Sequence, residues 1–430
     1  MTFSSISEKY GRIISESDPS LPIKWRQTAS VGRADVINRK KRSDIIKKVN
    51  RRSAAATVIK MEHYLDNAAT TRTCPEALEA AARVMSEVYG NPSSTHRKGR
   101  EAKHLLDECR RSVADALGAK PEELVFTSCG SESDNWALLG GAEVMKRTGR
   151  HIISSSVEHD AVRRSLDRLE GLGCTVTRLA PDSAGAITAE SVLAALRPDT
   201  ALISLMMVNN ETGAVTDIAG IARAVRAAGC RALIHTDAVQ GFMKLPFRAS
   251  KLGADLISIS GHKIHAVKGI GALYIRSGLR LPPFICGGGQ ESERRAGTEA
   301  MPAIAAFAAA ARLDPKIEYM RSLKTQLSER LTAAVPEAVI LETDAPHILS
   351  VSMPGWRSEV IMNFLEGREV YVSKSSACKQ GKRSHVLEAI GMRSDRIDGS
   401  IRIGLSRYTT EEDIEALVCG LSDARALAHR

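Results

Sequence analysis

Residues 256–276 read L-I-S-I-S-G-H-K-I-H-A-V-K-G-I-G-A-L-Y-I-R, and they decide the fold class of this chain. Two runs rich in Ile, Leu, Ser and Tyr predict strands, and the turn between them contains glycines, His262, Lys263 and Lys268. Such a turn places an amine at a sheet edge, where burial beside other cations lowers the pKa of a lysine. The neutral amine can then attack an aldehyde cofactor. Taken alone, the pattern is more typical of a surface lysine.

Short apolar segments alternate with helical segments before this stretch. We expect strands over residues 124–128, 151–156, 201–208 and 232–236, and helices that start near residues 131, 160 and 217. This alternation predicts an α/β fold, with a mostly parallel sheet covered by helices on both faces. Ligands bind such sheets beyond the carboxyl ends of the strands.

The chain of 430 residues is long enough for two domains. We expect a large domain over residues 62–314 and a smaller α+β domain over residues 315–430. We expect residues 1–61 to form a basic extension without fixed structure. Residues 1–60 hold fourteen Lys and Arg against five acids, so 14 − 5 = +9 of the net charge of +10 lies there. A solvated tail is favoured over a nucleic-acid-binding arm or a transit peptide.

The eight cysteines are scattered without CxxC pairs, and no apolar signal segment precedes them. We therefore predict a reduced, cytoplasmic protein without structural zinc or another metal site. The longest apolar run, residues 303–311, falls short of the ~18 residues that a membrane span needs. No membrane partner is predicted, and nucleic acid is not an expected partner because basic and aromatic residues do not interleave.

Polar residues follow the predicted strands. Gly130 and Ser131 begin a helix, whose free N–H groups and dipole can bind a phosphate, although Ser131 alone could simply cap the helix. His159 follows the next strand and is either a packed core histidine or a ring that stacks on a flat cofactor. Asn210 and Gln240 supply neutral hydrogen-bonding groups.

Asp237 follows an apolar run, and a buried carboxylate needs a partner. A protonated ring nitrogen is such a partner in pyridoxal phosphate enzymes. A phosphate cradle, a stacking ring, an acid for the pyridinium and Lys263 for the aldehyde rarely occur together by chance. Pyridoxal 5'-phosphate is therefore the predicted cofactor.

On these residues the chain resembles the cysteine desulfurases of the NifS/IscS kind, within the class-V aminotransferase group, from about Tyr64 to Leu421. The resemblance implies a pyridoxal phosphate transferase fold similar to that of aspartate aminotransferase. It implies that Lys263 binds the cofactor and that four residues bind its phosphate: Gly130, Ser131, Ser260 and His262. It further implies that Asn210 and Gln240 contact the hydroxyl of the cofactor ring. His159 would stack on this ring, and Asp237 would pair with its nitrogen. Thr298 resembles the residue that reaches the phosphate of a neighbouring subunit, which implies a homodimer.

Residues 372–387, V-S-K-S-S-A-C-K-Q-G-K-R-S-H-V-L, place Cys378 where that family has its catalytic thiol. Neighbouring cations favour the thiolate, and the polar setting argues against a cysteine buried as a small hydrophobe. Arg402 resembles the arginine that, with Asn210, binds the substrate, and its planar fork suits a carboxylate.

The resemblance implies conversion of L-cysteine to L-alanine, with a persulfide on Cys378 that passes to an acceptor protein, such as an iron–sulfur cluster assembly scaffold or a tRNA thiolation protein. Three departures from the family lie near the predicted cofactor: Cys129 for glycine, Gln290 for histidine, and residues 265–267 for an aromatic-Gly-Pro run. The alternatives are a selenocysteine lyase or another class-V enzyme, and a non-catalytic scaffold, against which Lys263 and Cys378 argue.

Overall fold

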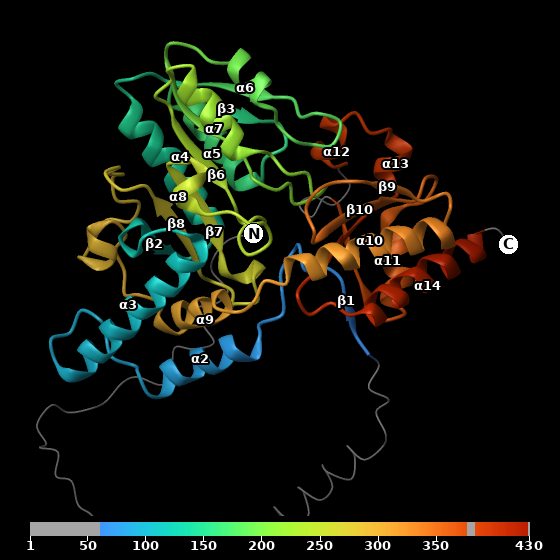
Figure 1. The fold of residues 1–430 in the computed structure, drawn as a ribbon, viewed down its shortest axis with the longest axis horizontal. Helices are drawn as coiled ribbons and strands as arrows, with labels where there is room; N and C mark the ends of the chain where they lie inside the picture. The colour runs from blue at the N-terminus through green and yellow to red at the C-terminus, as the bar shows by residue number, and fades with distance from the viewer. Residues whose placement is uncertain (1–60, 376–382, 429–430) are drawn as a thin grey trace, which may run out of the picture. The chain divides into compact units, whose positions relative to one another are not determined.

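The computed structural model describes residues 61–375 and 383–428, and the following concerns this part of the chain. The predicted basic extension, except Met61, and Cys378 lie outside the described residues. A seven-stranded sheet has the strand order β2-β8-β7-β6-β5-β3-β4 (Figure 1). Its strands are β2 (Leu124–Thr127), β3 (His151–Ser155), β4 (Thr175–Leu179), β5 (Thr200–Ser204), β6 (Leu233–Asp237), β7 (Leu256–Ser260) and β8 (Gly271–Ile275).

All neighbouring pairs in this sheet are parallel except those of β8, which runs antiparallel to β2 and to β7. The predicted mostly parallel α/β sheet is therefore confirmed. The opening stretch forms β7 and β8, as expected. A short 3-10 turn, Gly261–Lys263, follows β7 and carries the lysine.

Successive residues of the central strands point to opposite faces, because side chains alternate along a strand. Leu202 and Leu233 pack on one face together with Leu166 of α5. Ile203 and Ile234 pack on the other face in a separate cluster. The helices of the large sheet region are α2 (Pro75–Ser86), α3 (Arg97–Leu117), α4 (Gly130–Met145), α5 (Asp160–Gly171), α6 (Ala189–Ala194), α7 (Ile218–Ala227), α8 (Ala249–Leu252) and α9 (Met301–Ala311).

A second, antiparallel sheet has the order β12-β13-β10-β9. Its strands are β9 (Val339–Leu341), β10 (Ile348–Ser352), β12 (Ser373–Lys374) and β13 (Ser400–Gly404); the helices after residue 316 are α10 (Ile317–Ala334), α11 (Ser358–Glu366), α12 (His385–Ala389), α13 (Ser394–Asp398) and α14 (Glu411–Ala428). This region has its own apolar core, which contains Leu327, Val351 and Leu417. The predicted domain boundary between residues 314 and 315 stays a prediction.

The segment that follows Met61 joins this second region. β1 (His63–Tyr64) pairs in parallel with β11 (Val370–Tyr371), and Leu65 belongs to the second core. The chain turns after Asp66. The turn forms because the Asn67 amide donates to the backbone oxygens of Tyr64 at 3.0 Å and Gly404 at 2.9 Å.

In the central sheet, β5 is shorter than predicted, and one strand was missed. β5 ends at Ser204 instead of residue 208, since the N–H of Met206 donates to the Glu158 carboxylate at 3.0 Å. In the second region, residues 370–374 are divided between β11 and β12, which lie in different sheets. The missed strand, β4, lies at the sheet edge and is half-exposed, so it lacks the apolar run of a buried strand.

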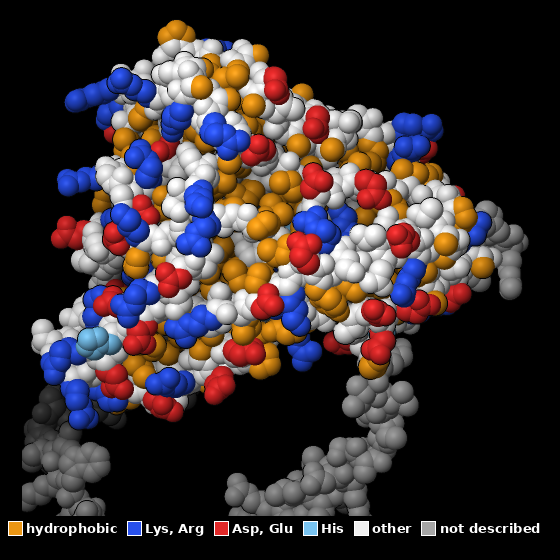
Figure 2. Space-filling view, in the orientation of Figure 1, with side chains coloured by type: hydrophobic (Ala, Val, Ile, Leu, Met, Phe, Trp, Pro, Cys, Tyr) orange, Lys and Arg blue, Asp and Glu red, His pale blue; other side chains and the backbone are white. Residues whose placement is uncertain are grey.

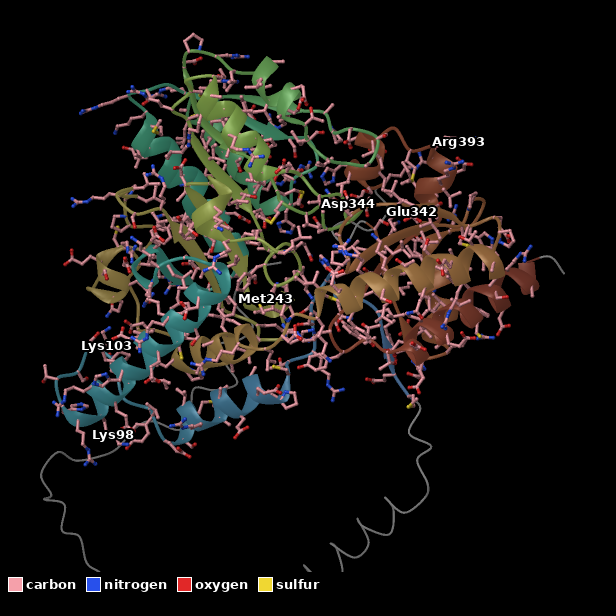
Figure 3. All side chains as sticks on the ribbon, in the orientation of Figure 1. Lys98, Lys103, Met243, Glu342, Asp344 and Arg393 are labelled. Carbon is pink, nitrogen blue, oxygen red and sulfur yellow. The ribbon has the colours of Figure 1, made fainter. Side chains whose placement is uncertain are left out.

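Charges of both signs are interspersed over the face shown in Figure 2, as the near-neutral balance outside residues 1–60 requires. On α3, Lys98 and Lys103 lie on the outer side in Figure 3 and pair with Glu101 and Asp107. Among the described residues, we find no helix with the length and apolar character of a membrane span.

Candidate active site

A cavity of about 1060 Å³ lies at the carboxyl ends of β2, β3, β5, β6 and β7. The structure brings together there all the cofactor- and substrate-binding residues that the sequence predicts within one subunit. They are Gly130, Ser131, His159, Asn210, Asp237, Gln240, Ser260, His262, Lys263 and Arg402. Thr298 is exposed and does not line this cavity.

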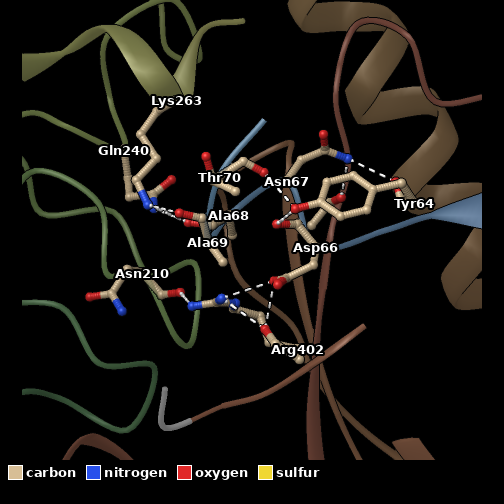
Figure 4. A network of polar contacts seen from close by, with 12 residues as sticks. Tyr64, Asp66, Asn67, Ala68, Ala69, Thr70, Asn210, Gln240, Lys263 and Arg402 are labelled. Atoms are coloured by element: carbon tan, nitrogen blue, oxygen red, sulfur yellow. Dashed lines mark hydrogen bonds and ion pairs between the residues drawn. The ribbon is translucent and has the colours of Figure 1, made fainter. Parts of the chain in front are cut away.

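Lys263 occupies the turn after β7. The hydrogen-bond acceptors of its amine are uncharged backbone oxygens. Nζ donates to the backbone oxygens of Ala68 at 2.7 Å and Ala69 at 2.6 Å (Figure 4). Burial and the nearby Arg402 lower the pKa of Lys263 from 10.5 to about 8. The amine is therefore available in its neutral, nucleophilic form near neutral pH.

This pKa predicts the pH dependence of cofactor attachment to cofactor-free protein. The neutral amine is the reactive form, so the attachment rate should rise about tenfold per pH unit below pH 8 and level off above it. The visible absorbance of the attached cofactor measures the rate. Lys268→Ala, which changes an exposed lysine of the same turn, should leave the profile unchanged. A rate that keeps rising to pH 10 would show an ordinary lysine.

The start of α4 fits a phosphate. Its N-cap residue is Cys129, which makes no side-chain cap, so Ser131 lies in the first turn and is not the cap. Gly130 is required here, because a Cβ atom at this position would lie 2.6 Å from Cγ2 of Val239. Beside it, at the end of β7, Ser260 Oγ is buried without a hydrogen-bond partner, and its Cβ would lie 3.6 Å from a Cβ atom at position 130.

His262 lies in the same part of the cavity as Ser260, and its imidazole is uncharged near neutral pH. Burial, followed by the charges of Lys263 and Lys268, lowers the pKa of His262 to about 4. Its Nδ1 lies 3.1 Å from the hydroxyl of Thr70, which orients the ring. A buried free hydroxyl, an uncapped helix start and a neutral imidazole donor together suit an anion with several oxygens.

Asp237 is the last residue of β6 and lies close to a second carboxylate, that of Asp134. Its carboxylate, that of Asp134 and the His159 ring bring ligand-type atoms within 4.8 Å of one another. Burial raises the pKa of Asp237, and the nearby His159 and Lys263 oppose this shift. A cation such as a protonated ring nitrogen would stabilise its ionised form.

The sequence interpretation missed Asp134, although it lies four residues after Gly130 and thus on the same helix face. Its Oδ1 is buried without a hydrogen-bond partner and lies 3.6 Å from Nε2 of His235. Burial and the nearby Asp237 hold the pKa of Asp134 well above its usual range.

His159 and Gln240, which the sequence predicts to contact the cofactor ring, each form a hydrogen bond with a backbone group. Nδ1 of His159 accepts from the N–H of Ala161 at 3.2 Å and caps α5, while the ring is exposed, which rules out a packed core histidine. The Gln240 amide donates to Ala68 O at 2.8 Å, and its oxygen lies 3.2 Å from Nε2 of His347. These hydrogen bonds orient the His159 ring and the Gln240 amide at the cavity wall.

Arg402 is buried in β13 yet lines the cavity. Nη1 donates to the backbone oxygen of Asn210 at 2.7 Å, and Nη2 donates to Ser373 Oγ at 2.8 Å and pairs with Asp66 at 3.2 Å. Nε is buried without a partner. The sequence interpretation did not single out Asp66, because its partner lies 336 positions away.

The described residues on both sides of 376–382 lie at the rim of the cavity. Lys374 pairs with Glu359 at 2.7 Å, and Arg383 pairs with Asp398 at 2.8 Å. The Ser384 hydroxyl donates to the Glu211 carboxylate. Of the three departures, Cys129 lines the cavity, whereas Gln290 and residues 265–267 do not.

The family model for class-V aminotransferases matches residues 63–417. A cysteine desulfurase from Nostoc sp. is 40% identical over 365 residues, which cover 83% of this chain and 90% of that protein. A solved NifS-like protein superposes with a TM-score of 0.80 and 36% identity, covering 85% of this chain and all of the other. A structure described as SspA in complex with cysteine gives a TM-score of 0.72 with 33% identity, covering 81% of this chain and 100% of the other.

Proposed function

Because this chain belongs to the class-V aminotransferase family and acts as a pyridoxal phosphate-dependent cysteine desulfurase, we propose that Lys263 is its cofactor-binding amine and Cys378 its sulfur-accepting thiol. One observation carries the first assignment: burial gives the Lys263 amine a pKa of about 8 inside a cavity whose wall also fits a phosphate. The second rests on the sequence around Cys378 and on the rim positions of Lys374 and Arg383.

When bound, the cofactor withdraws electrons from the α-carbon of the substrate amino acid. Ser131, Ser260, His262 and the first N–H groups of α4 hold its phosphate, while Asp237 stabilises a positive charge on the ring nitrogen. Arg402 binds the substrate carboxylate. With a pKa of about 8, Lys263 Nζ can also take up the α-proton and return it.

Cys378 then receives the sulfur. Its thiolate forms a sulfur–sulfur bond while the carbon–sulfur bond of the substrate breaks; the electron pair remains with the carbon, which takes a proton to give alanine. The thiolate is the reactive species. The persulfide that results carries the substrate sulfur to an acceptor, and the predicted acceptors, an iron–sulfur scaffold or a tRNA thiolation protein, stay predictions, as does the cytoplasmic location.

The test of this function is the stoichiometry of the products. With L-cysteine and a reductant, the holoenzyme should release alanine and sulfide in equal amounts. L-selenocysteine, the substrate of the rival class-V activity, should show a lower kcat/KM than L-cysteine. Alanine without sulfide, or a strong preference for the selenium substrate, would contradict the assignment.

We also infer a homodimer in which Thr298 contacts the cofactor phosphate of the partner. In support, Thr298 is exposed and away from the cavity of its own chain. The segment before it is rigidly tied, since Arg295 pairs with Glu132 of α4 at 2.8 Å and Arg110 pairs with Glu291 at 2.6 Å. A fixed exposed segment of this kind suits a contact across subunits.

Subunit mixing tests this arrangement. Lys263→Ala and Thr298→Glu homodimers should both be nearly inactive, the second because a carboxylate would repel the phosphate. Mixed dimers have both changes at one site and none at the other, so random pairing should restore about a quarter of wild-type turnover. Ser292→Glu, at another exposed position of this segment, serves as the control and should stay active. Without recovery on mixing, Thr298 would act within its own subunit.

A further inference from the structure

Arg402 holds a charge in a place where water cannot screen it. Its side chain is 2% exposed, whereas that of its ion-pair partner, Asp66, is 22% exposed. A buried guanidinium needs both a counter-ion and well-placed acceptors. In the described part of the chain, Asp66 is the carboxylate that forms an ion pair with it.

Three side chains close a triangle of hydrogen bonds around one nitrogen. Nη2 of Arg402 donates to Ser373 Oγ at 2.8 Å and lies 3.2 Å from Asp66 Oδ1, while Ser373 Oγ donates to the same Oδ1 at 2.7 Å. The backbone supports this geometry: Ser373 and Arg402 are partners in the β12–β13 pair, and Asp66 bridges to Gly404. The guanidinium plane is therefore fixed.

One N–H group of the guanidinium, that of Nε, has no partner among the described residues. Nη1 is used by the Asn210 backbone oxygen at 2.7 Å, but Nε is buried and donates to no group of the described residues. Recognition of a carboxylate by arginine depends on the orientation of its planar fork. A residue that sets this orientation controls how well a substrate carboxylate is held.

From these contacts we propose that Asp66 is a positioning residue, which together with Ser373 orients Arg402 and thereby gives the site its selectivity for substrates with an α-carboxylate. The proposal rests on the proposed role of Arg402. Asp66 does not itself touch the substrate; it acts through the guanidinium.

The same segment also reaches the amine. Two and three residues after Asp66, the backbone oxygens of Ala68 and Ala69 accept from Lys263 Nζ, as Figure 4 shows. Gln240 donates to Ala68 O at 2.8 Å and holds this part of the chain in place. One short segment thus fixes both ends of the site, the end for the carboxylate and the end for the amino group.

The test compares two ligands that differ only in the carboxylate, L-alanine and ethylamine, by titrating the visible absorbance of the holoenzyme. In Asp66→Ala, the Kd for L-alanine should rise about tenfold because the fork is no longer oriented. The Kd for ethylamine should not change. Asp66→Asn keeps an acceptor oxygen and should recover part of the loss. Asp423→Ala, which removes a carboxylate that pairs with Arg368 at 2.9 Å away from the cavity, is the matched control and should behave as wild type.

The variant Arg402→Ala distinguishes the proposed role of Arg402 in carboxylate binding from the positioning role of Asp66. If it weakens L-alanine and ethylamine equally, the proposed role of Arg402 is wrong. If it weakens L-alanine selectively while Asp66→Ala and Asp66→Asn do not, only the positioning role is overturned. Loss of the cofactor absorbance or of the folded state in Asp66→Asn would also overturn it, because Asp66 would then serve the fold and not the selectivity.

Discussion

Replacing Lys263 with alanine should lower the turnover of L-cysteine on the order of 10³-fold and remove covalent cofactor attachment. The substitution deletes the amine that is held between Ala68 O and Ala69 O with a pKa of about 8. The phosphate and ring contacts remain, so the variant should still bind the cofactor without a covalent bond. Borohydride reduction followed by denaturation measures this, since the cofactor should stay with the wild-type chain and leave the variant.

Lys268→Ala is the matched control for this result. Lys268 lies in the same turn but is exposed, so its loss should change neither turnover nor cofactor retention. Covalent cofactor that survived in Lys263→Ala would place the amine elsewhere. Lys244, buried and with a pKa lowered to about 7 by burial and by Arg407, would then be the first residue to test.

The second large effect is expected from Cys378→Ser. A hydroxyl cannot accept the substrate sulfur as a thiolate does, so sulfide release should fall by roughly 10²-fold or more. Binding should survive, because the cofactor and carboxylate contacts come from other residues. Addition of L-cysteine should therefore still change the visible absorbance of the variant, and this separates loss of the thiol from loss of the site.

Cys286 offers the control for the thiol, since it is exposed and away from the cavity. Cys286→Ser should keep full sulfide release. Cys129 lines the cavity, so Cys129→Gly shows whether a second thiol in the site takes part. Unchanged turnover in Cys378→Ser together with a loss in Cys129→Gly would transfer the role to Cys129.

The sequence was sufficient for six of the seven strands of the central sheet and for the main cofactor- and substrate-binding residues of the cavity. Alternation of buried strands with helices predicts where strands end, and in a parallel sheet those ends meet at one edge. Gly130, Asp237 and Lys263 could therefore be placed together without knowing a single contact. The turn after β7 could be predicted from its glycines and from the two apolar runs beside it.

The missed residues act through contacts between distant parts of the chain. Asp66 matters because it meets Arg402, and Ser373 because it meets both, and no local pattern marks such a triangle. Asp134 could have been predicted from the sequence, since its spacing of four residues from Gly130 places both on the same face of a helix. The half-exposed strand β4 and the division of residues 370–373 between two sheets depend on tertiary pairing, which periodicity does not report.

The most direct measurement is to locate the transferred sulfur. Holoenzyme is mixed with L-cysteine without reductant, its free thiols are alkylated, and its peptides are analysed by mass spectrometry. We predict one additional sulfur atom on Cys378 in the wild type, matched by an equal amount of alanine, and none in Lys263→Ala. Additional sulfur on another cysteine, or alanine formed while Cys378 stays unmodified, would contradict the proposed pairing of Lys263 with Cys378.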